Sequence, residues 1–391
     1  MRRTEALQGV RVAMFLNLLH RWESAELNEA EAAELLGVSE RTFRRWRNRH
    51  DEEGEAGLLD RRLGKASGKR VPVDREQEVE ALYRERYAGF RAKHFHEHLV
   101  KDHGFAWGYT WTKLFLQSRG LLTRAPRKGA HRRKRERRPL PGMMLHQDGS
   151  RHEWLEGRPA LDLIVTMDDA TGTIYSAFLV EEEGTASTFR ALKEVFGRGL
   201  PMSLYTDRGA HYFHTPKAGG EIDRRHLTQV GRALEQLGVE HIGAYSPQAR
   251  GRSERTFQTL QDRLVKELRL AGVSSLEAAN AFIRDVYLPA HNARFAVAPE
   301  QTVSAFVADT LGAWRELLCI QETRQVGNDN TVKWRRLSLQ IPPSPLRPHF
   351  VKASVRVHEY PDGSLAVFLG PHRLADYDPM GRLIEPNQEA A

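Results

Sequence analysis

The sequence contains a single cysteine, Cys319, among its 391 residues. An internal disulfide framework and a zinc site built from several cysteines are therefore excluded, and a reducing compartment is expected. No run of about 18 apolar residues is present, so a helical membrane span is not expected. The first ten residues, MRRTEALQGV, lack the apolar stretch of a secretory signal peptide. The 31 glycines are too few for a collagen repeat.

The composition that remains is that of a globular protein with an uneven charge distribution. The chain is 40% hydrophobic and 28% charged, which is enough to bury sizeable cores, and its length predicts two or three domains. Residues 1–140 hold 31 Lys and Arg against 20 Asp and Glu, a net charge of +11, whereas residues 141–391 hold 28 against 31, a net charge of −3. A basic front half indicates a module that binds a polyanion. A basic surface that serves only solubility is the alternative.

Residues 28–50, NEAEAAELLGVSERTFRRWRNRH, have the pattern of a helix-turn-helix. Ser39 stands in a good N-cap position, and Phe43 and Trp46 share one face of the second helix. Five arginines lie away from that face or beside it and are expected to contact DNA phosphates and base edges. They are Arg41, Arg44, Arg45, Arg47 and Arg49. A solvated basic helix in an α-hairpin is the alternative.

Three further segments complete the front half. Residues 57–70 read as a linker or a wing, and residues 71–123 as a second small helical module that resembles a helix-turn-helix. Residues 124–138 contain nine Lys and Arg against one Glu and no apolar periodicity, which predicts an extended linker that becomes ordered on a phosphate backbone. A nuclear localisation signal has the same composition. The basic cluster expected to bind DNA is Arg132, Arg133, Lys134 and Arg135.

Four histidines lie in residues 93–103, and two of them, His94 and His98, are one helical turn apart. This spacing suits two ligands of one metal ion. No cysteine or well-placed carboxylate in the segment completes such a site, and Phe95 and Leu99 define the buried face of the helix. Histidines at the surface are therefore the favoured interpretation.

From Pro139 onward, short apolar strands alternate with helices. The order predicted for residues 141–268 is β-β-β-α-β-α-β-α. After this core, residues 274–292 read as an amphipathic helix that ends near Pro289. Residues 330–341, 351–360 and 364–370 read as strands of a small β-barrel.

Three acidic residues of the central segment stand out by their placement. Asp148 interrupts an apolar strand, Asp207 ends a strand, and Glu254 lies in the first turn of a helix. By helical angle, Glu254 borders the apolar face of that helix, so its side chain is expected to point toward the sheet. Carboxylates that face inward are costly unless a cation neutralises them. Three such groups from separate elements are suited to hold two Mg²⁺ or Mn²⁺ ions for phosphoryl transfer.

Other polar residues near these three acids have less distinctive positions. Asp168 and Asp169 precede Ala170-Thr171-Gly172 and are expected to form local hydrogen bonds in a turn. His152 and His211 are equally suited to position water or DNA and to serve as solvated side chains, so neither receives a catalytic role.

The chain resembles insertion-sequence transposases with a DDE catalytic domain, and is most similar to the ISNCY group. The matching segments are LLGVSERTFRRW, LHQDGSRHEWLEGR, YTDRGAHY, SPQARGRSERTFQTLQDRLVKEL and HNARFAVAP. The resemblance implies an RNase H-like core that cuts transposon ends and joins the 3′-hydroxyl to target DNA. It also implies that Asp148 bridges two Mg²⁺ (or Mn²⁺) ions, and that Asp207 and Glu254 each complete one.

Two features depart from the family pattern. The 46 residues between Asp207 and Glu254 exceed the spacing common in relatives, and residues 214–226 look like the insertion, expected as a loop away from the metals. Relatives often carry Lys or Arg two turns after the glutamate, whereas this chain has Gln261. Arg255 or Arg263 is expected to contact DNA instead.

The predicted fold class is multidomain: all-α helix-turn-helix modules, a central α/β RNase H-like core and a small C-terminal β-barrel. The predicted boundaries are 1–70, 71–123, 124–140 for the linker, 141–320 for the core, 330–380 for the barrel and 381–391 for a disordered tail. The expected partners are double-stranded inverted repeats, target DNA and further copies of the chain, with no membrane. The expected location is the bacterial cytoplasm, with the protein on the nucleoid when bound.

The leading function is that of a DNA transposase. A DNA-binding regulator with an inactive core is the alternative from another class, and a nuclease without strand transfer shares the same two-metal chemistry.

Overall fold

The computed structural model describes residues 3–60, 70–124, 136–215, 220–223, 225–245, 251–310 and 312–384. The chain divides into two compact units, Met1–Glu80 and Ala81–Ala391. Each unit is described by itself. Among the described residues, no helix combines the length and the apolar character needed to cross a membrane.

The first unit is a small helical domain. Its helices are α1 (Arg3–Glu23), α2 (Glu29–Leu36), α3 (Glu40–Glu53) and α4 (Glu55–Leu58), and α5 (Val73–Glu85) begins in it. A capping box between Asn28 and Glu31 starts α2, and Gly37, with a φ of 73°, ends it. Ser39 caps α3, as expected. The core gathers around Phe15, whose ring centroid lies 5.3 Å from that of Phe43. The predicted helix-turn-helix at α2 and α3 is confirmed.

The second unit begins with the rest of α5, followed by α6 (Ala92–His103) and α7 (Tyr109–Ser118). The centroids of the Tyr83 and Phe95 rings lie 5.1 Å apart between α5 and α6. His96 Nδ1 and Thr112 Oγ1, at 3.0 Å, join α6 to α7. These contacts pack α5, α6 and α7 against one another.

A five-stranded mixed sheet forms the centre of the second unit. Its strands are β1 (Leu145–His152), β2 (Leu161–Asp168), β3 (Ile174–Val180), β4 (Ser203–Thr206) and β5 (Glu240–Gly243), in the order β3-β2-β1-β4-β5. The first three strands pair antiparallel, whereas β4 runs parallel to both β1 and β5. The chain order of strands and helices agrees with the predicted β-β-β-α-β-α-β-α.

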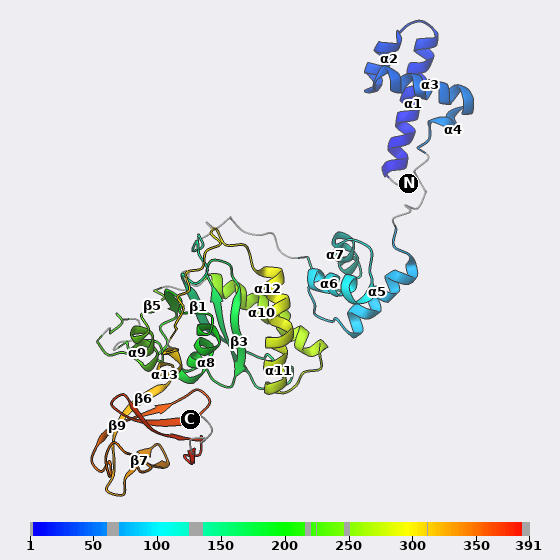
Figure 1. Ribbon diagram of the computed structural model, residues 1–391. Coiled ribbons are helices and arrows are strands. Elements are labelled where there is room, and N and C mark those ends of the chain that lie inside the picture. The colour runs from blue at the N-terminus through cyan, green and yellow to red at the C-terminus, as the bar shows by residue number, and fades with distance from the viewer. Residues whose placement is uncertain are drawn as a thin grey trace. The chain divides into compact units, whose positions relative to one another are not determined.

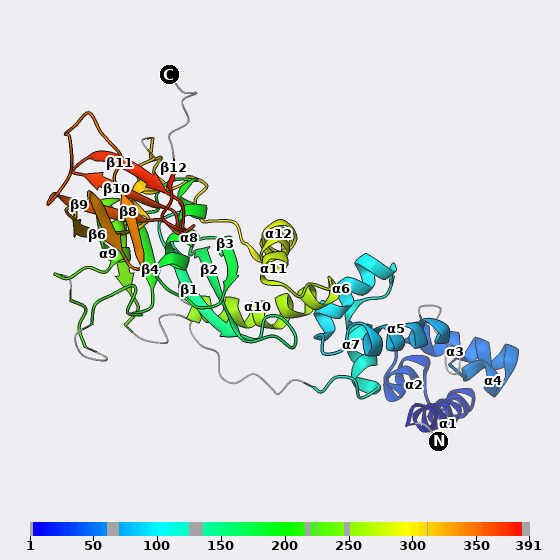
Figure 2. The same cartoon turned by 90° about the horizontal axis from the view of Figure 1, so that it is seen from below.

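Helices cover both faces of this sheet, as Figures 1 and 2 show. On one face, α8 (Thr185–Phe196) and α9 (Gln229–Gln236) pack on Leu145 and Leu204. On the other face, α10 (Gly251–Leu270) packs on alternate residues of β2, among them Leu163 and Val165. The sheet is therefore covered by helices on both faces. Polar side chains on its strands lie among buried apolar residues.

The helix after α10 continues further than the sequence predicts. It runs as α11 (Leu276–Phe282), a π-helical turn η2 (Ile283–Tyr287) and α12 (Leu288–Phe295). Pro289 lies in the first turn of α12, directly after the π turn, and the helix continues through it. The π turn shifts the bonding pattern there, since the Leu288 N–H bonds to Ile283 O. The predicted end near Pro289 is therefore wrong.

The C-terminal strands form an open sheet, and the expected β-barrel is not confirmed. After the short helix α13 (Trp314–Leu317), the sheet contains β6 (Ile320–Gln325), β9 (Ser354–Glu359), β10 (Leu365–Leu369), β11 (His372–Tyr377) and β12 (Leu383–Ile384). Its order is β12-β11-β10-β9-β6, and no hydrogen-bonded ladder among the described strands closes it.

The strand predicted over 330–341 is instead a hairpin of β7 (Thr331–Trp334) and β8 (Leu337–Gln340). Arg335, with a φ of 49°, makes the turn between them. The apolar residues change phase at this turn, from the even positions Val332 and Trp334 to the odd positions Leu337 and Leu339, and this shift was the available signal.

Candidate functional site

Asp148 lies in the middle of the sheet, on β1, and is 7% exposed. Because strand side chains alternate, His146, Asp148 and Ser150 share one face of β1. That face lies under α10, since the Gln261 amide nitrogen on α10 is 3.0 Å from Ser150 Oγ. Asp148 therefore belongs to the side of the sheet that α10 covers.

Asp207 follows the last residue of the neighbouring strand β4. The parallel register pairs Leu145 with Leu204 and His146 with Tyr205, so each β4 partner lies 59 positions after its β1 residue. Asp207 lies the same 59 positions after Asp148, and adjacent strands are about 4.8 Å apart. The Gly209 N–H donates to Asp207 Oδ1 at 2.8 Å and orients this carboxylate. The sheet thus brings Asp148 and Asp207 to neighbouring positions.

Glu254 lies in the first turn of α10, between two contacts that tie this helix to the sheet. Before it, Arg252 Nη1 donates to Asp169 O at 3.0 Å, at the end of β2 beside the start of β1. After it comes the contact of Gln261 with Ser150. Glu254 is therefore beside the part of β1 that carries Asp148.

The side chain of Glu254 is exposed, so the expectation that it points inward is wrong. The buried stripe of α10 runs through Ser253 and Phe257. Glu254 is next to this stripe, at a helical angle that suits either orientation.

Glu183 is a carboxylate of this region that the sequence analysis missed. It lies against Gly149, since a Cβ at Gly149 would overlap the Glu183 carboxylate. Tyr212 Oη donates to Glu183 Oε1 at 3.4 Å, and His211 Nε2 is 3.6 Å from the same oxygen. A glycine inside a strand often marks such a close approach, and Gly149 directly after Asp148 was the available signal.

The negative charge of the site affects the pKa of Tyr212. Burial, together with the charge of Glu183 and the more distant charges of Asp207 and Asp148, raises the pKa of this phenol well above its ordinary value. Tyr212 therefore stays protonated and donates its hydrogen bond throughout the physiological pH range.

His152, the other histidine considered, lies with its ring centroid 5.2 Å from that of Trp154.

The two acids of the β2–β3 turn differ in their contacts. Asp168 Oδ2 accepts from the Thr171 N–H and hydroxyl, both at 2.8 Å, which is the expected local turn, and its Oδ1 also accepts from the distant Gly142 N–H at 2.9 Å. Asp169 bonds to distant segments: Oδ1 is 2.7 Å from His146 Nε2, Oδ2 accepts from the Arg138 N–H at 2.7 Å, and Arg252 forms an ion pair with it. The purely local expectation for Asp169 is therefore wrong.

The arginines of α3 fall into two groups. Arg44 Nη2 is 2.7 Å from Glu29 Oε1, Arg47 lies over the Trp22 ring, and Arg49 donates to Leu59 O. Two others, Arg41 and Arg45, are exposed and one helical turn apart, and within the described part of the chain they have no ion pair. Arg255 is exposed beside Glu254, whereas Arg132, Arg133, Lys134 and Arg135 lie outside the described residues.

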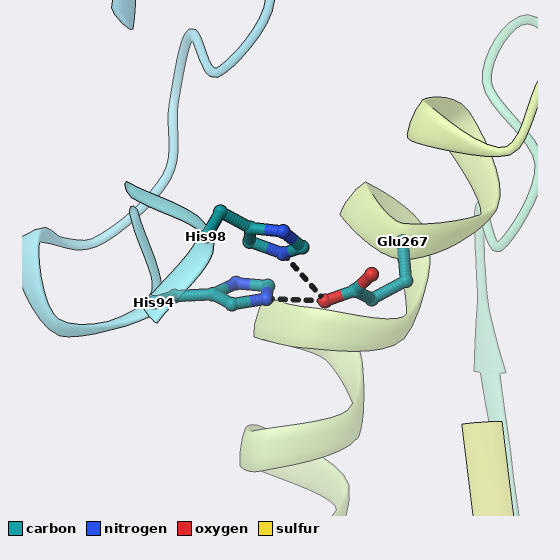
Figure 3. Close-up of side chains that lie close together, drawn as sticks. All are labelled: His94, His98 and Glu267. Atoms are coloured by element: carbon teal, nitrogen blue, oxygen red, sulfur yellow. Dashed lines mark hydrogen bonds and ion pairs between the residues drawn. The ribbon is translucent and has the colours of Figure 1, made fainter. Parts of the chain in front are cut away.

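The histidines of α6 are not at the surface. His94 is 2% exposed, and both His94 and His98 contact Glu267 of α10 (Figure 3). The expectation of surface histidines is wrong because the partner carboxylate comes from a helix 169 or more positions away in the sequence. Among the described residues, these three form a group whose potential ligand atoms lie within 4.8 Å of one another.

Comparison with known proteins gives the family. Residues 11–89 match the family described as Winged helix-turn helix. The y4bF protein of Sinorhizobium fredii, named as a transposase, is 31% identical over 366 residues, which cover 92% of this chain and 79% of the relative. The chain belongs to this transposase family.

Two further matches are partial. The transposase for insertion sequence IS1202 of Streptococcus pneumoniae is 32% identical to this transposase over 162 residues, which cover 41% of the chain and 34% of the relative. The integrase catalytic core domain of HTLV-2, solved in complex with magnesium, matches with 18% identity and a TM-score of 0.28. That match covers 36% of this chain and 82% of the integrase domain.

Proposed function

We propose that this transposase cuts the ends of its element and joins the 3′-hydroxyl to target DNA, using a DDE site in an RNase H-like core. Asp148, Asp207 and Glu254 are the three metal-binding acids of this site. The observation that carries the proposal is the register of β1 and β4, which sets Asp148 and Asp207 side by side. Glu254 is included as the third acid because two hydrogen bonds hold α10 beside the same strand.

The residues present fit a pair of Mg²⁺ or Mn²⁺ ions. Their donors are carboxylate oxygens, which hard divalent cations prefer. Asp148 would contact both ions, and Asp207 and Glu254 would each complete one. Two ions held in this way activate the attacking oxygen and stabilise the leaving oxygen during phosphoryl transfer.

The remaining polar groups orient the site. The Gly209 N–H donates to Asp207 Oδ1 and orients this carboxylate. The bond from Arg252 to Asp169 O fixes the first turn of α10, and with it the backbone of Glu254. Because Arg255 is exposed next to Glu254, its guanidinium is suited to bind a phosphate of the DNA backbone.

The helix-turn-helix and the basic segment would bring the transposase to its DNA. Arg41 and Arg45 are the α3 residues best placed for contacts with phosphates and base edges. The nine positive charges of residues 124–138 would add binding that does not depend on sequence. Synapsis of two element ends requires more than one copy, so an oligomer on DNA is part of the proposal.

The test is a cleavage and joining assay on the flanking inverted repeats with Mg²⁺. Asp148→Asn and Asp207→Asn should each lower both steps by at least about 100-fold, the loss typical when a main electrostatic group is removed from an active site. The matched control is Asp285→Asn, since Asp285 is exposed and pairs only locally with Arg284.

Full activity in either variant would overturn the assignment of the site. Cleavage without joining by the wild type would indicate a nuclease. DNA binding without either reaction would indicate a regulator.

A further inference from the structure

His94, His98 and Glu267 form a compact cluster between α6 and α10 that has no part in the proposed chemistry (Figure 3). Both histidines direct Nε2 at the same carboxylate oxygen. His94 Nε2 lies 2.6 Å and His98 Nε2 lies 3.0 Å from Glu267 Oε1. The two histidines are one turn apart on α6, so their rings point the same way.

Both ring nitrogens of His98 face a carboxylate, Nδ1 that of Asp102 and Nε2 that of Glu267. Its Nδ1 lies 2.7 Å from Asp102 Oδ2, and an ionised carboxylate can only accept, so Nδ1 carries a proton. If Nδ1 of a neutral His98 carries the proton, Nε2 carries a lone pair, and this lone pair faces the Glu267 oxygen. Two acceptors at 3.0 Å repel each other, unless His98 carries a second proton or a metal ion lies between them.

The surroundings of His98 match a metal ligand with an outer partner. A histidine ligand usually donates its other ring nitrogen to a carboxylate, which fixes the tautomer and raises the basicity of the ligating nitrogen. Asp102 makes this contact with His98. His94 is almost fully buried, and its Nδ1 has no partner among the described residues, so its one polar contact is directed at the cluster.

Nearby positive charges do not block a cation. Arg263 is bound to Glu97, and Lys266 lies 2.6 Å from Asp262. Arg269 turns away to the Ala88 carbonyl. The cationic side chains of α10 next to the cluster therefore have partners of their own.

We propose that His94, His98 and Glu267 bind one Zn²⁺ ion, which fastens the helical module of α6 to α10. Two imidazoles and a carboxylate are a common ligand set for zinc, and water can supply the fourth ligand. Ligand atoms around tetrahedral zinc lie about 3.3 Å apart, given bonds of about 2.0–2.1 Å. The observed 2.6 and 3.0 Å separations are shorter, so zinc binding requires Glu267, whose side chain is 25% exposed, to move away from the two histidines.

The position of the ion would give it a structural role. Glu267 lies 13 residues after Glu254 on the same helix. The ion would join the module that precedes the core to the helix that carries a proposed catalytic acid. It would not take part in phosphoryl transfer.

The experiment measures zinc in the full-length, untagged transposase after dialysis, by elemental analysis and by calorimetric titration with Zn²⁺. The wild type should bind one tight equivalent, and the variant His98→Gln should bind it at least about 100-fold more weakly. Asp102→Asn should weaken binding about 10–100-fold, because it removes only the outer partner. The matched control is His372→Gln, an exposed histidine of β11, which should bind as the wild type does.

Two further measurements separate this site from other causes. Asp207→Asn should keep the tight equivalent, which shows that zinc is not held by the proposed Mg²⁺ site. X-ray absorption of the zinc-loaded wild type should show two imidazole ligands, a result that does not depend on any variant folding. Absence of a tight equivalent, equal binding by His98→Gln, or oxygen ligands alone would overturn the proposal and leave a proton on His98 as the charge of the cluster.

Discussion

At the scale of single residues, Asp169 shows how a side chain outside the proposed metal site can hold that site together. Its carboxylate bonds to His146 on β1 and to the Arg138 N–H, and it pairs with Arg252 at the start of α10. Burial alone would raise the pKa of Asp169. The hydrogen bonds from His146 and Arg138, with the positive charges nearby, instead hold this pKa well below its usual range.

This shift predicts a stability that depends on pH. Because the pKa of Asp169 is lower in the folded than in the unfolded protein, the unfolded chain takes up the proton first as the pH falls. The contribution of Asp169 is therefore complete above about pH 4 and is lost below it. Asp169→Asn should lower the free energy of unfolding by about 3 kcal/mol at pH 7.

Urea denaturation of both proteins at pH 7 and pH 3 measures this effect. The gap between the wild type and Asp169→Asn should shrink at pH 3, whereas the exposed Asp285→Asn should match the wild type at both values. A gap of equal size at both pH values would contradict the assigned contacts of Asp169.

At the scale of elements, the arginines of α3 differ in their contacts, and this difference predicts which of them bind DNA. All three of Arg41, Arg44 and Arg45 are exposed, but Arg44 is paired with Glu29, whereas Arg41 and Arg45 have no ion pair among the described residues. Arg41→Ala and Arg45→Ala should each weaken binding to inverted-repeat DNA by about 1–3 kcal/mol, more than Arg44→Ala does. Fluorescence anisotropy titrations of the full-length protein measure the three affinities. Equal losses for all three variants would show that the ion pair with Glu29 does not withhold Arg44 from DNA.

The strands and helices also show which features of the fold can be predicted from the sequence. Alternation and helical angle predict the strands of the core, because a buried sheet face imposes period two and a packed helix imposes its own apolar stripe. The β7–β8 turn at Arg335 was missed although the apolar positions change phase there, from even-numbered to odd-numbered residues.

The residues of the candidate site also differ in whether the sequence predicts them. Asp148 and Asp207 stand out as strand acids, whereas Glu183 and the partner of His94 depend on contacts between distant segments. Such contacts leave no local pattern in the sequence.

At the scale of the whole molecule, the uneven charge predicts how binding responds to salt. Each phosphate neutralised on duplex DNA adds about 0.9 to the slope of log affinity against log salt concentration. Changing Arg132, Arg133, Lys134 and Arg135 together to Ala should therefore reduce the slope by up to about 3–4.

A charge-matched variant should leave the slope unchanged. Four exposed arginines of the C-terminal sheet and of the β7–β8 hairpin provide it: Arg324, Arg335, Arg356 and Arg373. Equal reductions in both variants would show that net charge alone sets the salt response.

The parallel register of β1 and β4 also has a consequence for how this transposase can change in evolution. Between Asp148 and Asp207 the chain runs through β2 and β3 of the same sheet, then leaves it for α8 and returns at β4. Insertions and deletions in the connecting loops therefore change the length of the chain without separating the two acids. A single residue inserted in β1 before Asp148 would turn that side chain to the opposite face. Natural length variation should collect in the loops and spare the strand.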